Sequence, residues 1–353
     1  MPVRTAIAAV ALAMSAPSAA QLNLQPGTAT LADFAFHDGS RLAELKVSYR
    51  TLGTPRRDAA GEIDNAVLLL HGTGGSGANF LAPALSEGLF GPGKPLDTAR
   101  YYVIIPDQIG HGGTSKPSDG MRMAFPPYDY ADMVEAQKKL LTGTLGIRKL
   151  RAVMGMSMGG MMTFQWATTY PDFAEKFVPM GCYPIEIAGQ NRLQRKLIIE
   201  AIKGDPAWNG GDYTSQPVAG LRGATSIAML MASGALHLQT AYPTRAAADK
   251  FAEESMAMSL ASGRDANDAI YQTDASRNYN PWDRLDRITA PVLWINFADD
   301  LLNPPALGVA EKAVARMPNA RFVLVPGTVQ TRGHGTLNQP EFWGEEVARF
   351  LAE

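Results

Sequence analysis

Ser157 lies at the centre of the pentapeptide 155–159, which reads glycine-methionine-serine-methionine-glycine. An apolar run over 150–154 precedes this pentapeptide, and a stretch compatible with a helix follows over 159–170. A sharp turn between a strand and a helix exposes a serine hydroxyl, and flanking glycines leave room for the neighbouring backbone. The helix N-terminus also favours negative charge that develops beside it. The pattern predicts that Ser157 is a nucleophile that attacks a carbonyl carbon.

A serine hydroxyl needs a histidine base and an acid that orients the histidine. The chain has five histidines, and folds with this kind of turn place the base after both the nucleophile and the acid, which leaves His237 and His334. No aspartate or glutamate at a strand end separates His237 from Ser157. His334 stands in the glycine-flanked loop 331–335, between an apolar run and the last predicted helix. We expect His334 to be the base.

Two adjacent aspartates compete for the role of the acid. Asp299 and Asp300 follow the apolar run 292–297, which is the strand expected before the one that leads to His334. Hydrolases with this turn usually carry a proline four residues after the acid, and Pro304 therefore favours Asp300. Asp299 remains the alternative; the aspartate that is not the acid would cap the turn or face solvent.

The negative charge on the attacked carbonyl oxygen needs two backbone N–H donors. The amide of Met158 directly follows the nucleophile. The second donor should come from the glycine-rich loop 71–75 that follows the apolar run 66–70, and we expect it to be Thr73, with Gly74 as the alternative. This loop has neither the Walker nor the GxGxxG spacing, which argues against phosphate binding.

Two further histidines lie outside this arrangement. His71 opens the glycine-rich loop, and His111 lies in the segment 107–115, which resembles the Asp-x-x-Gly-His-Gly-x-Ser turn of many such hydrolases. The histidine of that turn is not the base. We expect structural roles for both residues.

The elements that must position these residues follow an alternating pattern. Short apolar runs without polar alternation predict strands that are buried on both faces; they cover 66–70, 101–105, 150–154, 177–180, 292–297 and 321–325. Helix-compatible segments separate them, which predicts an α/β fold of the α/β-hydrolase type with a mostly parallel, doubly wound sheet. The alternation stops over 183–286, where helical segments predict a lid inserted into a core of 21–182 and 287–353.

Composition narrows the class of ligand. The 353 residues carry a net charge of −2 without long runs of either sign, which argues against nucleic acid or anionic membrane as a partner and favours a small molecule. The pattern requires no cofactor, and no cluster of metal ligands is visible. The single cysteine, Cys182, is expected to be a buried thiol. Residues 1–20 are typical of a signal peptide, which predicts a periplasmic or secreted protein, and no later segment is long enough to span a membrane.

The sequence resembles the homoserine O-acetyltransferase branch of the α/β-hydrolase superfamily. The resemblance covers most of the chain after residue 20 and is carried by the segments 47–53, 65–71, 91–98, 155–161 and 170–171. It implies a catalytic triad of Ser157, Asp300 and His334. Because the related acetyltransferases are often dimers, it also makes the lid a candidate homodimer interface.

Two positions depart from that branch. The resemblance implies an aspartate after the triad histidine and an arginine six residues before an Asp-Pro pair in the lid, where this chain has Gly335 and Ile199. Arg195, one helical turn before Ile199, is the nearest substitute. Burying a zwitterionic amino acid without both countercharges costs several kcal/mol, which argues against homoserine as the acceptor.

The sequence therefore predicts an exported hydrolase that cleaves a small ester, lactone or related carbonyl compound through an acyl-enzyme on Ser157. The alternative is an O-acyltransferase with an acceptor other than homoserine. A binding protein that kept the fold but lost catalysis is the third reading; such proteins usually lack a member of the triad, and here Ser157, Asp300 and His334 are all present.

Overall fold

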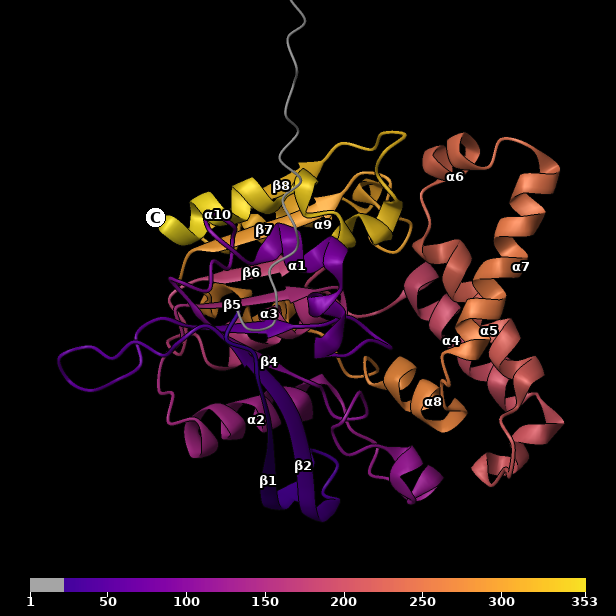
Figure 1. Ribbon diagram of the computed structural model, residues 1–353, viewed down its shortest axis with the longest axis horizontal. Coiled ribbons are helices and arrows are strands. Elements are labelled where there is room, and N and C mark those ends of the chain that lie inside the picture. Colours follow the sequence, from indigo (N-terminus) through magenta and orange to yellow (C-terminus); the bar gives the residue numbers. More distant parts are fainter. Residues whose placement is uncertain (1–21) are drawn as a thin grey trace, which may run out of the picture.

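An eight-stranded sheet forms the centre of the computed structural model, which describes residues 22–353 (Figure 1). The strand order is β1-β2-β4-β3-β5-β6-β7-β8. Strands β3 to β8 are parallel to their neighbours, except that β4 pairs antiparallel with β2, which is also antiparallel to β1. The bounds are Gln25–Ala35 (β1), Arg41–Leu52 (β2), Ala66–Leu70 (β3), Tyr102–Pro106 (β4), Ala152–Met156 (β5), Phe177–Met180 (β6), Val292–Phe297 (β7) and Ala320–Val325 (β8). The prediction of a mostly parallel α/β-hydrolase sheet is confirmed.

Side chains of the central strands alternate between two apolar layers. In β3, Val67 and Leu69 belong to one layer, whereas Leu68 and Leu70 belong to the other. Helices α1 and α10 contribute to the first layer, and α2, α3 and α9 contribute to the second. Their bounds are Pro83–Leu89 (α1), Tyr130–Lys139 (α2), Met158–Thr169 (α3), Val309–Val314 (α9) and Gly344–Ala352 (α10). Because both faces are covered, the strands read as continuous apolar runs.

The sequence-based bounds differ from the structure by one or two residues in β4, β5 and β8, and they omit one hairpin. Strand β5 ends at Met156 rather than at 154, so Ser157 follows the strand directly. The hairpin of β1 and β2 is not among the predicted strands, because its exposed positions interrupt any apolar run. Figure 1 shows this hairpin extending away from the rest of the sheet.

The predicted lid contains only helices among its regular elements. Helices α4 to α8 lie between β6 and β7 in the chain and gather on one side of the sheet (Figure 1). Their bounds are Gly189–Lys203 (α4), Val218–Ala232 (α5), Ala235–Ala241 (α6), Arg245–Ala261 (α7) and Ala266–Asp274 (α8). Ile198, Ile202, Leu221 and Ile270 form part of an apolar cluster shared by α4, α5 and α8. The division of the chain into a core and a lid at 183 and 286 stays a prediction.

Two further expectations concern the ends of the chain and its thiol. The segment 1–20, predicted to be a signal peptide, lies outside the described residues. In residues 22–353, we find no helix with the length and apolarity required to cross a membrane. Cys182 is buried as expected, and burial raises the pKa of its thiol well above the usual value.

Candidate active site

Ser157 occupies the turn between β5 and α3 in a strained backbone conformation. Its φ of 57° and ψ of −114° lie in a region that residues other than glycine rarely adopt. Its backbone N–H donates to the carbonyl oxygen of Met180 at 2.8 Å, which ties the turn to β6. Such a conformation costs roughly 1–3 kcal/mol and persists only where the surrounding structure enforces it.

The flanking glycines are required by space rather than by their own backbone angles. A Cβ atom built on Gly155 would lie 2.1 Å from the carbonyl oxygen of Gly159, and one built on Gly159 would lie 2.1 Å from that of Leu70. Both distances are far below a van der Waals contact. The prediction that these glycines remove colliding side chains is confirmed.

His334 connects Ser157 to Asp300 through both nitrogens of its ring. His334 Nδ1 lies 2.7 Å from Asp300 Oδ2, and His334 Nε2 lies 2.8 Å from Ser157 Oγ. A carboxylate can only accept a hydrogen bond, so Nδ1 carries the proton and donates it. Nε2 is then the acceptor for the serine hydroxyl. The arrangement provides a base for the serine proton.

The surroundings of Asp300 keep it ionised. Burial by itself would raise its pKa, but the nearby His334 and the hydrogen bonds donated to the carboxylate hold the pKa below its usual value. Besides His334, the donors are Asn303 Nδ2 at 2.9 Å and the backbone N–H of Leu302 at 2.8 Å. Asp300 is 1% exposed, so these donors replace water around the carboxylate.

Asp299 binds the loop that carries His334 rather than the histidine itself. Its Oδ2 accepts hydrogen bonds from Thr331 Oγ1 at 2.8 Å and from the backbone N–H of Gly333 at 3.0 Å. Of the two competing aspartates, Asp300 is therefore the one that is hydrogen-bonded to His334. Asp299 neither caps its own turn nor faces solvent, the two roles expected of the aspartate that is not the acid; it holds the loop 331–333 instead.

Two backbone amides beside Ser157 remain available for a ligand. Met158 is the first residue of α3, and Thr73 lies in a tight turn closed by a 3.2 Å hydrogen bond from Gly75 N to Gly72 O. A Cβ atom built on Gly72 would lie 3.4 Å from Ser157 Cβ, so this turn packs against the serine. Among residues 22–353, neither the amide of Met158 nor that of Thr73 donates to a protein acceptor.

Comparison with known families agrees with the fold. Residues 65–328 match the family described as alpha/beta hydrolase fold. The chain belongs to this superfamily. Within it, the chain resembles the homoserine O-acetyltransferase branch, as expected from its sequence segments.

Relatives of this α/β hydrolase carry names from two functional classes. A probable acyltransferase from Methanothermobacter thermautotrophicus is 31% identical over 90% of this chain and 95% of its own. A homoserine O-acetyltransferase from Pelobacter propionicus is 32% identical over 81% of this chain and 84% of its own. The crystal structure of an acetylester hydrolase from Corynebacterium glutamicum superposes with a TM-score of 0.80, at 21% identity, over 96% of this chain and 99% of that one. The last similarity supports the fold.

The other histidines of this α/β hydrolase take different roles. His71 Nε2 accepts from the backbone N–H of Gln108 at 3.1 Å, and His71 Nδ1 donates to Gly72 O at 2.9 Å. Because burial lowers its pKa, His71 is neutral and serves as a structural link between two loops, as expected. His237 contacts the carbonyl oxygen of Val329 instead of joining the hydrogen bonds of Ser157.

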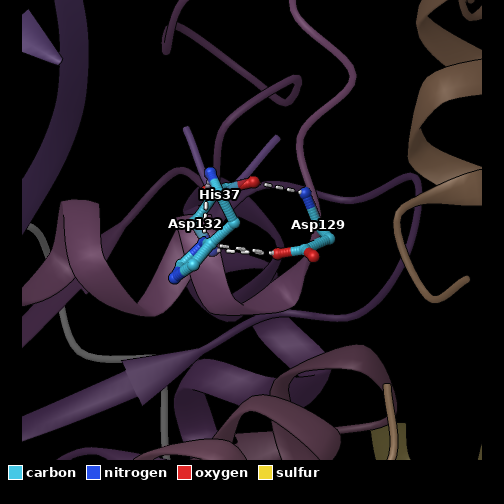
Figure 2. Close-up of side chains that lie close together, drawn as sticks. All are labelled: His37, Asp129 and Asp132. Atoms are coloured by element: carbon cyan, nitrogen blue, oxygen red, sulfur yellow. Dashed lines mark hydrogen bonds and ion pairs between the residues drawn. The ribbon is translucent and has the colours of Figure 1, made fainter. Parts of the chain in front are cut away.

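A second cluster of ligating side chains lies where α2 begins. Figure 2 shows His37 beside Asp129 and Asp132, with His37 Nδ1 2.6 Å from Asp132 Oδ1 and 3.9 Å from Asp129 Oδ1. The two aspartates cap α2 reciprocally: Asp129 Oδ1 accepts from the N–H groups of Ala131 and Asp132, and Asp132 Oδ2 accepts from the N–H of Asp129. Asp129 Oδ2 accepts from Asn278. Helix capping accounts for this cluster.

The structure places no charged side chain at Ile199 or Gly335, the two positions that depart from the acetyltransferase branch. Ile199 is buried within the apolar cluster of the lid, and Gly335 follows His334 in a short 3₁₀ helix. Arg195 is buried, and it donates from Nε to Asn191 Oδ1 at 2.9 Å and from Nη1 to Thr273 O at 3.2 Å. Protein acceptors therefore already use two of its donors.

Sequence reasoning missed the residues that support the site from outside. Asn303 was not singled out, although an asparagine three residues after Asp300 is a common turn signal. Arg264 and Gln272 were also missed. A Cβ atom built on Gly74 would lie 3.6 Å from Arg264 Nη2 and 3.8 Å from Gln272 Oε1. No local pattern predicts this contact, because about 190 residues separate the two segments.

Proposed function

We propose that this α/β hydrolase cleaves a small ester, lactone or related carbonyl compound through an acyl-enzyme on Ser157. The hydrogen-bonded series from Asp300 through His334 to Ser157 is the observation that carries the proposal. It joins three segments that lie far apart in the chain, and it ends on a serine held in a strained turn. Strain at a residue that can do chemistry is typical of functional sites.

The acylation step follows from the donor and acceptor roles in these two hydrogen bonds. His334 Nε2 takes the proton of Ser157 Oγ as this oxygen attacks the carbonyl carbon of the substrate. The carbonyl oxygen becomes negatively charged, and the amides of Met158 and Thr73 donate to it. As the tetrahedral intermediate collapses, His334 gives the proton to the leaving oxygen. Asp300 keeps the imidazole oriented and stabilises its positive charge.

Water completes the cycle by the reverse sequence of proton transfers. His334 Nε2 takes a proton from a water molecule as the water attacks the acyl carbon. The proton then returns to Ser157 Oγ, and a carboxylic acid leaves. The same two amides bind the second oxyanion. This cycle requires only residues of the chain and water.

The choice of water over an amino-acid acceptor rests on two positions. With Ile199 and Gly335 in place of charged residues, a zwitterionic acceptor would lose its water shell without gaining matching charges. Water is uncharged, so it needs no countercharge in the site. The hydrolase is therefore our first candidate.

A test of the reaction type uses one acyl donor and several acceptors. We expect the wild-type protein to hydrolyse short 4-nitrophenyl esters and to be labelled by a fluorophosphonate, whereas the Ser157→Ala variant does neither. The rate at which the acyl-enzyme decays should be the same in buffer and in buffer that contains amino acids or alcohols. Strong acceleration by one acceptor would replace the hydrolase with a transferase.

The transferase is the second candidate because of its relatives. The Methanothermobacter thermautotrophicus protein is named a probable acyltransferase, and the Pelobacter propionicus protein a homoserine O-acetyltransferase. Such an enzyme would share the acylation step and would differ only in the group that attacks the acyl carbon. Its acceptor would be an alcohol other than homoserine.

We also propose that the enzyme acts outside the cytoplasm. The proposal depends on the apolar segment over 6–14 and the small residues over 18–20. N-terminal sequencing of protein isolated from the producing cells tests it. A mature N-terminus at Gln21 in the extracytoplasmic fraction is expected, and an uncleaved chain confined to the cytoplasm would contradict it.

A further inference from the structure

Buried polar atoms without partners are concentrated around the turn 72–75. Seven buried side-chain nitrogen and oxygen atoms in residues 22–353 have no hydrogen-bond partner. Four of these atoms belong to side chains at this turn or next to the residues that contact it: His111 Nε2, Tyr128 Oη, Arg264 Nε and Gln272 Oε1. Buried polar groups are almost always satisfied, so such a concentration marks a place where a ligand or water binds.

Contacts between these side chains bring them together. Gln272 Nε2 donates to the carbonyl oxygen of Gly110 at 2.7 Å, and a Cβ atom built on Gly110 would collide with Tyr128 Oη. The ring of His111 lies 5.1 Å from that of His71, which opens the glycine-rich loop. The four atoms therefore belong to one polar region beside the turn that packs against Ser157, rather than to separate sites.

Arg264 stands out within this region because it is cationic. Its guanidinium lies against Gly74, beside Gln272 Oε1, and makes no hydrogen bond or ion pair with any residue of 22–353. The adjacent Asp265 does not compensate the charge, because its carboxylate accepts from Tyr213, Gln216 and the N-terminus of α8. Arg195, by contrast, already donates to two protein acceptors.

Electrostatics agrees with this geometry. Burial lowers the pKa of Arg264, and no acid opposes the effect. An arginine nevertheless keeps its proton in a protein. Its positive charge also contributes to the lowered pKa of His111, after burial and the neighbouring His71. A half-buried cation without an anion is destabilising, and a bound anion would offset that cost.

We propose that Arg264 determines substrate specificity by binding a carboxylate that the substrate carries in addition to its ester. The proposal rests on the proposed function, since Arg264 reaches the reacting atoms only through the turn that packs against Ser157. The planar fork of guanidinium donors makes no hydrogen bond to residues 22–353, and its geometry matches that of a carboxylate.

The turn 72–75 places Ser157 and Arg264 along the same short stretch of backbone. Gly72 lies against Ser157 and Gly74 lies against Arg264, and the two glycines are at most about 7 Å apart. A short dicarboxylic acid esterified at one end fits this spacing. Its ester carbonyl would face Ser157 while its free carboxylate pairs with Arg264.

The test compares charged and neutral esters of similar length. We would measure kcat/KM for the mono-4-nitrophenyl esters of succinate, glutarate and adipate, and for 4-nitrophenyl butyrate as the neutral reference. The ratio of charged to neutral kcat/KM should fall roughly 10- to 100-fold in Arg264→Met. Arg264→Lys should lose less, because it keeps the charge. The matched control is Arg245→Met at an exposed position of α7, whose ratio should equal that of the wild type.

The outcomes separate this proposal from the proposed function. An unchanged ratio in both Arg264 variants would overturn the carboxylate site while leaving the hydrolase in place. If the wild type hydrolyses none of the esters, the proposed function fails, and calorimetric titration with glutarate still decides the site. Binding that Arg264→Met abolishes and Arg245→Met retains would support it. If neither variant alters the binding of glutarate, or if the wild type does not bind glutarate, the carboxylate site is ruled out. Water alone would then satisfy these polar atoms.

Discussion

Asp299 and Asp300 are neighbours in the chain but hold different parts of the same loop. Asp300 Oδ2 lies 2.7 Å from the ring of His334, whereas Asp299 Oδ2 lies 3.0 Å from the backbone nitrogen of Gly333. One carboxylate thus orients the imidazole, and the other fixes the backbone that carries it. The two aspartates should respond differently to the same substitution.

Replacing each aspartate with asparagine separates these contributions. We expect Asp300→Asn to lower kcat by about 10⁴-fold, because an amide no longer selects the imidazole tautomer that accepts the serine proton. Asp299→Asn should lower kcat much less and should mainly lower the melting temperature, because it weakens two hydrogen bonds to the loop. Steady-state kinetics and thermal unfolding measure both effects. Equal losses of kcat in the two variants would contradict the division of roles.

The strained turn predicts a conflict between activity and stability at Ser157. Ser157→Gly and Ser157→Ala both remove the nucleophile and should both be inactive. Only glycine tolerates a φ of 57° without strain, so Ser157→Gly should be more stable than Ser157→Ala by about 1 kcal/mol. Chemical denaturation of the two variants provides the comparison. An alanine variant at least as stable as the glycine variant would show that the turn stores no strain.

Asp268 predicts a pH dependence of stability that is separate from the active site. Burial raises the pKa of Asp268 to about 6, even though Ser118 donates to its carboxylate from Oγ at 2.7 Å and from the backbone N–H at 2.9 Å. Its pKa in the unfolded chain is about 4. The folded state therefore binds the proton more tightly, and its stability falls as pH rises from about 4 to about 6.

The variant Asp268→Asn tests this sign. It cannot ionise, so its free energy of unfolding relative to the wild type should increase between pH 4 and 6 by about 2–3 kcal/mol, and stay constant above. Urea unfolding at several pH values gives the difference directly. A difference independent of pH would show that Asp268 titrates at its ordinary pKa in the folded protein.

The two positions that depart from the acetyltransferase branch predict a change of acceptor. A Cβ atom built on Gly335 would lie 3.3 Å from Arg332 Cβ and 3.8 Å from Ala232 O, so a side chain fits there with a small adjustment. We expect the double variant Ile199→Arg/Gly335→Asp to transfer acetyl groups to homoserine at least tenfold faster than the wild type. Mass spectrometry of O-acetylhomoserine provides the readout. Transfer that remains at the wild-type level in a folded double variant would mean that other residues exclude homoserine.

The sequence alone was sufficient to predict the central strands and the position of Ser157. Strands β3, β6 and β7 coincide with their apolar runs because helices cover both faces of the sheet. The turn at Ser157 depends on close backbone approaches that only glycine permits, and glycines at fixed spacing are visible in a sequence. These features are local or depend on burial, so the order of apolar residues and glycines in the sequence predicts them.

Only the tertiary structure decided which aspartate contacts His334 and where Arg264 lies. Asp299 and Asp300 have the same chemistry and nearly the same position in the chain, and the direction of each carboxylate depends on how β7 meets the loop before α10. The contact of Arg264 with Gly74 depends on how the lid packs over the sheet. An interaction between distant segments leaves no periodicity in either segment, so the fold had to bring the residues together before their chemistry could be seen.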